Sequence, residues 1–207
     1  VEIAIVLVIV GLLIGGVLKG QEMITNAKLK RIESDNAGIA AAMFSYQDRY
    51  TQLPGDDSQA QGRFDIFSGG SSVNGGGDGI IDGTWSPTTA VETSFFWNHL
   101  RAAGLIAGGG LDATQPTNAY GGLIGIRDGA LGIAGHVTVF GQIEGPIAKI
   151  IESRLDDGVP NGGRVQSACL SGAPPCEGSG STTDIDAAGT GDVSYSDAAR
   201  YDIAFRL

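Results

Sequence analysis

Basic residues are scarce in this 207-residue chain, which has 13 of them against 23 acidic residues and a formal net charge of −10. Residues 1–50 hold five residues of each sign, so the whole negative charge lies in residues 51–207. Surfaces that bind nucleic acid or anionic lipid need clustered lysine and arginine. The charge distribution therefore argues against both kinds of surface in the C-terminal part of the chain, and we expect no nucleic-acid partner.

Residues that perform catalysis or bind soft metals are also few. The chain has two histidines, His99 and His136, and two cysteines, Cys169 and Cys176. It contains no G-x-S-x-G, Walker A or H-E-x-x-H motif. Two cysteines without a nearby histidine supply at most half of a zinc site. We therefore expect a protein that is not an enzyme, in which His99 is a packing or surface residue.

Cys169 and Cys176 lie in a segment rich in glycine, proline and serine, with the turn Pro174-Pro175 between them. We favour a disulfide, because a short irregular loop has few other means of staying ordered. The alternative is a pair of free thiols in a reducing compartment.

Proline is absent before Pro54, and residues 3–18 form an uncharged, almost wholly apolar run. After this run, apolar and aromatic residues recur at a spacing that keeps them on one face of a helix: Ile24, Ile32, Ile39, Met43, Tyr46 and Tyr50. The pattern predicts one continuous helix over residues 1–50, roughly 75 Å long. Residues 1–20 need lipid or other helices around them, whereas the amphipathic residues 21–50 need a domain to pack against.

A single carboxylate, Glu2, stands at the head of the apolar run. An acid at the centre of a membrane helix costs about 2.5–3.5 kcal/mol, and buried charges need partners. We expect another copy of the chain to supply that partner. Gly11, Gly15 and Gly16 allow helices to approach closely, and they also weaken the helix locally. The alternative is a single-span membrane anchor in which these glycines have no special role.

The run from Glu2 to Leu18, EIAIVLVIVGLLIGGVL, resembles the N-terminal helix of the type IV pilin superfamily, which includes pilus subunits and the pseudopilins of type II secretion. In that family a short basic leader is cleaved before the apolar run, and the new first residue is N-methylated. The family's acid usually follows four mature residues, whereas only Val1 precedes Glu2, so we expect about three residues to precede Val1. The proline usual just past the middle of the run is absent, and Lys19 stands near its place.

The resemblance implies a pilin fold, which is an α+β protein whose long helix packs its C-terminal half against a loop-rich antiparallel sheet. It also implies a homo-oligomeric helical filament, a pilus or fimbrium used in cell adhesion or motility. The subunit is expected in the bacterial inner membrane first, and the pilus assembly machinery then adds it to an extracellular filament. In such a filament Glu2 pairs with the N-terminal amine of a neighbouring subunit.

Two other functions remain open at this point. The chain can be a pseudopilin or a minor tip pilin of a secretion or adhesion system, with a head that binds a ligand. It can also be a membrane-anchored receptor or adhesin that forms no filament.

Residues 51–207 are expected to form one globular head that begins at the turn Pro54-Gly55. Glycine is concentrated there, which favours many turns and irregular loops. The expected elements are a long loop over 55–90, helices over 91–103 and 146–155, a strand within 129–143 and a strand over 201–207. In the last strand, alternation puts Tyr201, Ile203 and Phe205 on a buried face and leaves the other face exposed.

One segment of the head, residues 74–82, has the composition of a calcium-binding loop. Aligned on an EF-hand loop, Asn74, Asp78 and Asp82 take oxygen-ligand positions. Asp56 and Asp57, in the preceding turn, can complete an oxygen shell. The sequence therefore raises Ca²⁺ as a candidate cofactor.

The match to that loop is partial, because Gly76 and Trp85 stand where side-chain oxygens are wanted. The alternative is a turn of glycine and aspartate residues held by hydrogen bonds from the aspartate side chains.

Overall fold

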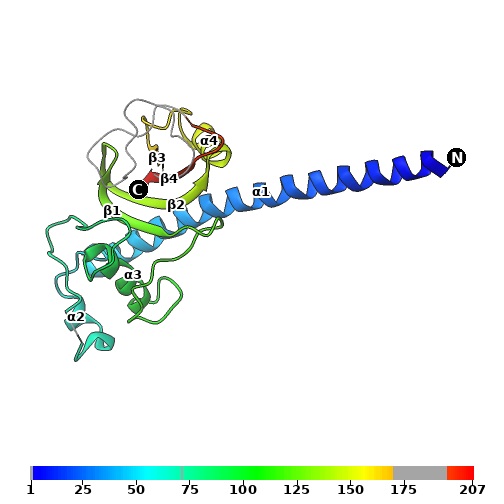
Figure 1. Cartoon of the computed structure of the whole chain (residues 1–207). Coiled ribbons are helices and arrows are strands. Elements are labelled where there is room, and N and C mark those ends of the chain that lie inside the picture. Colours follow the sequence, from blue (N-terminus) through cyan, green and yellow to red (C-terminus); the bar gives the residue numbers. More distant parts are fainter. Residues whose placement is uncertain (1, 71, 170–194) are drawn as a thin grey trace.

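The longest element is helix α1, Glu2–Tyr50, in a computed structural model that describes residues 2–70, 72–169 and 195–207. Figure 1 shows α1 extending far beyond the rest of the chain, with only its C-terminal part against the head. The continuous helix expected from the sequence is therefore confirmed. Its buried face begins at Leu29 and continues through Ile32, Ile39, Met43 and Tyr46, whereas Ile24 lies before the first contacts and is exposed.

A four-stranded antiparallel sheet forms the centre of the head, with the strand order β1-β2-β4-β3. The strands are β1 (Ile124–Ala130), β2 (Ile133–Glu144), β3 (Val165–Cys169) and β4 (Arg200–Arg206). The sheet lies beside the C-terminal part of α1 (Figure 1). The protein is therefore α+β, with a long N-terminal helix and an antiparallel sheet, as the sequence predicts.

Strand β4 was expected to have one exposed face, and this is wrong. β4 is an inner strand between β2 and β3, and its residues from Tyr201 to Phe205 are buried on both faces. Ile203 belongs to the main core beside α1, while Ala204 packs on the opposite face with Val139 and Ala168. Asp202 is buried on that face too, and its Oδ1 accepts a hydrogen bond from the Gln142 amide at 3.1 Å.

Helices cover the remaining core. They are α2 (Ala60–Arg63), the 3₁₀ turn η1 (Asp65–Phe67), α3 (Glu92–Ala102) and α4 (Gly145–Leu155). Helices α3 and α4 lie where the apolar periodicity predicts them. Strands β1 and β3 were not predicted.

Three side chains of α3, namely Phe96, Trp97 and Leu100, are completely buried in the core that α1 shares with the sheet.

Polar contacts also hold helix α1 on the head. The Thr138 hydroxyl of β2 donates to Asn36 Oδ1 at 2.5 Å, and Arg154 of α4 lies 3.5 Å from Glu33. Leu29 is the first buried side chain of α1, and the large apolar side chains before it are exposed.

Candidate functional site

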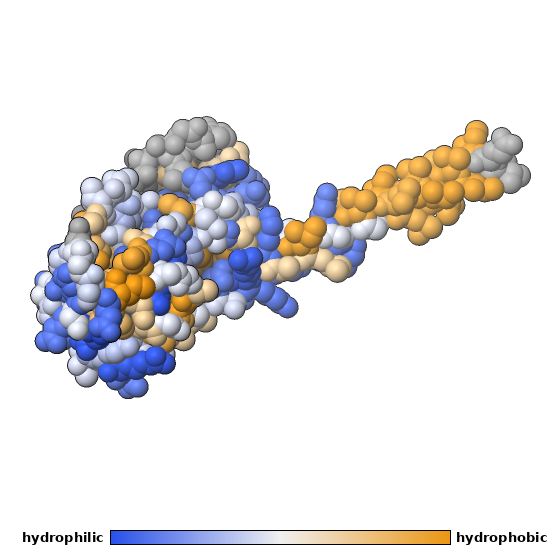
Figure 2. Space-filling model, turned by 90° about the horizontal axis from the view of Figure 1, so that it is seen from below, coloured by the Kyte–Doolittle hydropathy of each residue, from blue (hydrophilic) through white to orange (hydrophobic). Residues whose placement is uncertain are grey.

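The first candidate site is the N-terminal part of α1, where a run of large apolar side chains is exposed. Twelve such side chains lie within residues 3–18, and their exposed fractions run from 44% at Val10 to 78% at Ile3. On the side in view, Figure 2 shows a continuous hydrophobic surface along this part of the helix. Burying each side chain is worth roughly 1.5–3 kcal/mol. By length and composition α1 is sufficient to cross a membrane.

The glycines of this segment touch nothing else in the described chain. A Cβ atom added at Gly11, Gly15 or Gly16 would meet no atom within 4 Å. Gly11 and Gly15 are four residues apart in the helix, so they lie on the same face. Their small size therefore serves no contact within the described protein and leaves a shallow face open to another helix. Glu2 is the first residue of α1.

The second candidate site is the segment 74–82, in which calcium was expected. The structure brings Asp56 to this segment, but its carboxylate faces backbone N–H groups. Oδ1 accepts hydrogen bonds from Gly77 at 2.5 Å and Asp78 at 3.2 Å, and Oδ2 accepts one from Gly79 at 2.7 Å. The loop therefore wraps around the carboxylate as a ring of donors.

Glu92, the first residue of α3, holds the same segment from the other side. Its Oε1 accepts a hydrogen bond from the Gly76 amide at 2.5 Å, and its Oε2 accepts one from the Asp82 amide at 2.8 Å. Burial raises the pKa of Glu92, and the nearby Asp56 and Asp82 add to the rise, although the two backbone hydrogen bonds oppose it. The sequence did not single out this residue, because a glutamate at a helix N-terminus is common on surfaces.

Three of the other four expected ligands, Asn74, Asp78 and Asp57, are likewise engaged by donors. Asn74 Oδ1 accepts from the Gln61 amide at 2.8 Å, and Asp78 Oδ1 accepts from the amide of Ile80, two residues on, at 3.0 Å. The Asp57 carboxylate accepts hydrogen bonds from Arg63, from the Tyr46 hydroxyl and from the Gln59 amide. These are the hydrogen bonds of the alternative interpretation, an aspartate-glycine turn. In the described part of the chain, the acidic cluster with ligand atoms close together lies elsewhere, at the end of α4.

His99 is completely buried beneath this loop region. Its Nδ1 accepts a hydrogen bond from the Gly55 amide at 2.9 Å, and its Nε2 lies 2.8 Å from the Val73 carbonyl oxygen. Nε2 therefore carries the proton, since a carbonyl can only accept. Burial lowers the pKa of His99 to about 4, so the ring is neutral. Its contacts are those of a packing residue that joins two loops.

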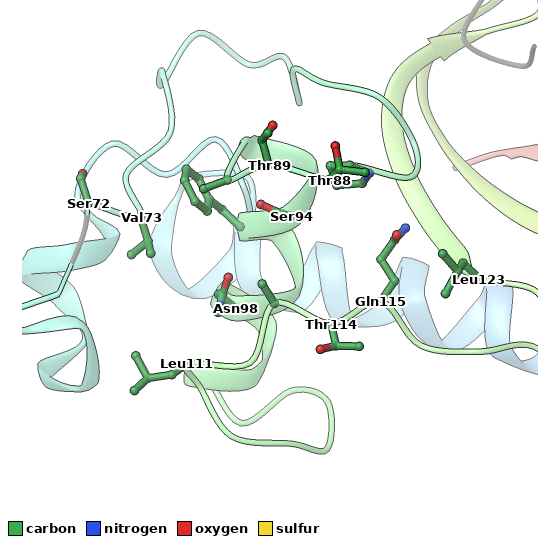
Figure 3. A pocket seen from close by; sticks show the side chains of 14 residues that line it. Ser72, Val73, Thr88, Thr89, Ser94, Asn98, Leu111, Thr114, Gln115 and Leu123 are labelled. Carbon is green, nitrogen blue, oxygen red and sulfur yellow. The ribbon is translucent and has the colours of Figure 1, made fainter.

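A hollow of about 550 Å³ lies between α3 and the loops that face it (Figure 3). Ser94 and Asn98 line it from α3, and Thr114 and Gln115 line it from the facing loop. None of its described lining residues has an ionisable side chain. This site suits a neutral ligand, and sequence reasoning missed it because the lining comes from segments that are far apart in the chain.

Cys169 ends β3, is fully buried and is disulfide-bonded. Cys176, its expected partner, lies outside the described residues.

Comparison of the chain with protein-family models, with curated proteins and with solved structures gives no match.

Proposed function

We propose that this protein is the structural subunit of a type IV pilus-like filament and polymerises through the N-terminal part of α1. One observation carries the proposal: α1 is a single helix whose C-terminal part is built into the head, while residues 3–18 are apolar and exposed. The exposed side chains do not follow one stripe, because the six consecutive residues from Ile5 to Val10 are all apolar and exposed and so point to every side of the helix. Such a surface suits a helix that is surrounded by lipid before assembly and by other helices afterwards.

The charge of the head agrees with this role. The excess of acidic residues lies entirely in residues 51–207, so the heads on the outside of a filament repel those of other filaments and keep them in solution. At the other end of the molecule, Glu2 would meet the N-terminal amine of a neighbouring subunit. Two charges that are each costly in an apolar core neutralise one another when they pair.

The test is to express the full chain with its leader and assembly machinery, and to collect surface filaments for electron microscopy and mass spectrometry. The proposal expects thin filaments in which this chain is the main component. Filaments that lack the chain, or a chain that stays in the membrane fraction while filaments form normally from another subunit, would contradict it.

A minor or tip pilin with a ligand-binding head is the second candidate, and the hollow beside α3 favours it. A subunit used for recognition needs such a site, whereas a purely structural subunit does not. The same mass spectra separate the two, because a minor subunit would be present in far fewer copies than the main component.

A further inference from the structure

Three carboxylates meet where α4 ends. Glu152 lies in the last turn of the helix, and Asp156 and Asp157 follow it directly. One carboxylate oxygen from each of the three lies within 4.8 Å of the other two. Asp156 also reaches β3, because its Oδ2 accepts hydrogen bonds from the amides of Arg164 and Val165. The cluster therefore sits at the junction between α4 and the start of an edge strand.

Glu152 gives an independent reason to look for a ligand here. The residue has no exposed surface, and its Oε1 has no hydrogen-bond partner. The hydroxyl of Tyr195 donates only to the other oxygen, Oε2, at 3.2 Å. A buried carboxylate oxygen that has given up water is normally bound by a donor or a metal ion.

No basic side chain of the described residues forms an ion pair with any of the three carboxylates. Arg154, the nearest arginine along α4, contacts Glu33 of α1 instead. The C-terminus of a helix carries partial negative charge, which adds to the field of the carboxylates. The site thus places a buried oxygen without a partner beside two further carboxyl groups, and a cation from outside the chain could bind all three.

The donor set identifies the class of cation. All three groups are carboxylates, and neither histidine nor cysteine is among them. Hard cations prefer such oxygen ligands. Ca²⁺ takes several carboxylate ligands in a flexible geometry, whereas Mg²⁺ usually keeps several waters and takes only one or two carboxylates. Three carboxyl groups with one oxygen each within 4.8 Å of the others therefore favour Ca²⁺.

We propose that Glu152, Asp156 and Asp157 bind one Ca²⁺ and that the ion fastens the end of α4 to β3. Water completes the coordination on the outer side, where Asp157 is exposed. The buried oxygen of Glu152 becomes a ligand, and the repulsion among three neighbouring carboxylates is removed. Asp156 and Asp157 also accept backbone hydrogen bonds, each through one oxygen. What distinguishes this site from the segment 74–82 is Glu152 Oε1, a buried carboxylate oxygen with no hydrogen-bond partner.

The test is a Ca²⁺ titration of the full chain in detergent micelles after EGTA treatment, followed by calorimetry and thermal unfolding. We expect one saturable site and a rise in Tm with Ca²⁺, with a much smaller rise at equal Mg²⁺. Glu152→Gln and the milder, exposed Asp157→Asn should each weaken binding at least about tenfold. Asp78→Asn, which removes a carboxylate from the segment 74–82, is the matched control and should leave binding unchanged.

Two outcomes would overturn the proposal. In the first, the Tm does not change with Ca²⁺ and calorimetry detects no heat of Ca²⁺ binding. In the second, Glu152→Gln and Asp157→Asn both still bind Ca²⁺ as the parent chain does. Loss of binding in Asp78→Asn alone would belong to this second outcome, because it would place the ion in the segment 74–82.

Discussion

The Tyr46 hydroxyl donates a 2.7 Å hydrogen bond to Asp57 Oδ2 and thereby joins the last turns of α1 to the first turn of the head. The Asp57 carboxylate also accepts hydrogen bonds from Arg63 Nε at 2.9 Å and from the Gln59 amide at 2.8 Å. Burial disfavours its ionised form, but these hydrogen bonds outweigh burial and lower the pKa of Asp57. A residue that the sequence suggested as a calcium ligand is thus an internal link between helix and head.

Removal of the Tyr46 hydroxyl tests this link. We expect Tyr46→Phe to lower the free energy of unfolding by about 1–3 kcal/mol, because a buried carboxylate loses one of its donors. Tyr50→Phe is the matched control: the two rings pack at 4.6 Å, but Tyr50 lies at the partly exposed end of the helix. Its effect should stay within about 0.5 kcal/mol. Thermal unfolding of the full chain measures both, and equal effects would contradict the assigned role.

His99 should make the stability of the head depend on pH. In the unfolded chain the ring binds a proton below its ordinary pKa of 6.5, whereas in the folded protein burial keeps it neutral down to about pH 4. The stabilising contribution is therefore complete above pH 6.5 and is lost as the pH falls toward 4. The full loss is on the order of 3 kcal/mol.

The variant His99→Gln can still accept from Gly55 and donate to Val73, but it does not titrate. We expect its stability at neutral pH to be somewhat lower and its decline between pH 6.5 and 4 to be shallower than in the parent chain. Denaturation at several pH values gives both slopes. Parallel slopes would show that His99 is not the titrating group.

Local periodicity was enough to predict α1, α3, α4 and the position of β4, because each has apolar residues at a regular spacing. It was not enough for β1 and β3. Glycines at 125 and 129 interrupt the pattern of β1, and Gln166 and Ser167 do the same in β3. β1 forms a tight hairpin with β2, and β3 pairs with β4, which follows much later in the chain. Neither pairing leaves an alternating apolar pattern in the strand itself.

The candidate sites show a similar limit. The sequence suggested Asp56 and Asp57 as calcium ligands, but residue types alone do not say whether a carboxylate faces a cation or backbone amides. Glu92 and Glu152 were missed, because a single glutamate in a helix has the same local pattern whether it is exposed or buried. Only the packing of α3 and α4 distinguishes these two from surface charges.

Gly75 should be intolerant of any side chain. An added Cβ would lie 2.3 Å from the Gly55 carbonyl oxygen and 2.4 Å from Asp56 Cα, and both are backbone atoms that cannot move aside cheaply. We expect Gly75→Ala to displace the loop from the Asp56 carboxylate and to cost about 1–3 kcal/mol of stability.

The control for Gly75 is Gly62→Ala in α2. An added Cβ there meets nothing within 4 Å, so we expect stability to be unchanged or raised by up to about 1 kcal/mol. Thermal unfolding of the two variants side by side decides the matter. A Gly75→Ala protein as stable as Gly62→Ala would mean that the loop does not pack against residues 55–56.

Replacement of Glu2 separates anchoring in a membrane from assembly of a filament. We predict that Glu2→Ala and Glu2→Leu abolish filaments while the chain still fractionates with membranes, because residues 3–18 keep their apolar character. Glu22→Ala is the control: its carboxylate is exposed and pairs only with Lys19 at 2.8 Å, one turn away on the same helix. Electron microscopy and immunoblots of membrane fractions measure the two properties independently.

Normal filaments from Glu2→Ala would rule out pairing with a neighbouring amine as the driving contact. Loss of membrane association would point to a folding defect. Only loss of filaments with retained membrane association identifies Glu2 as an assembly residue.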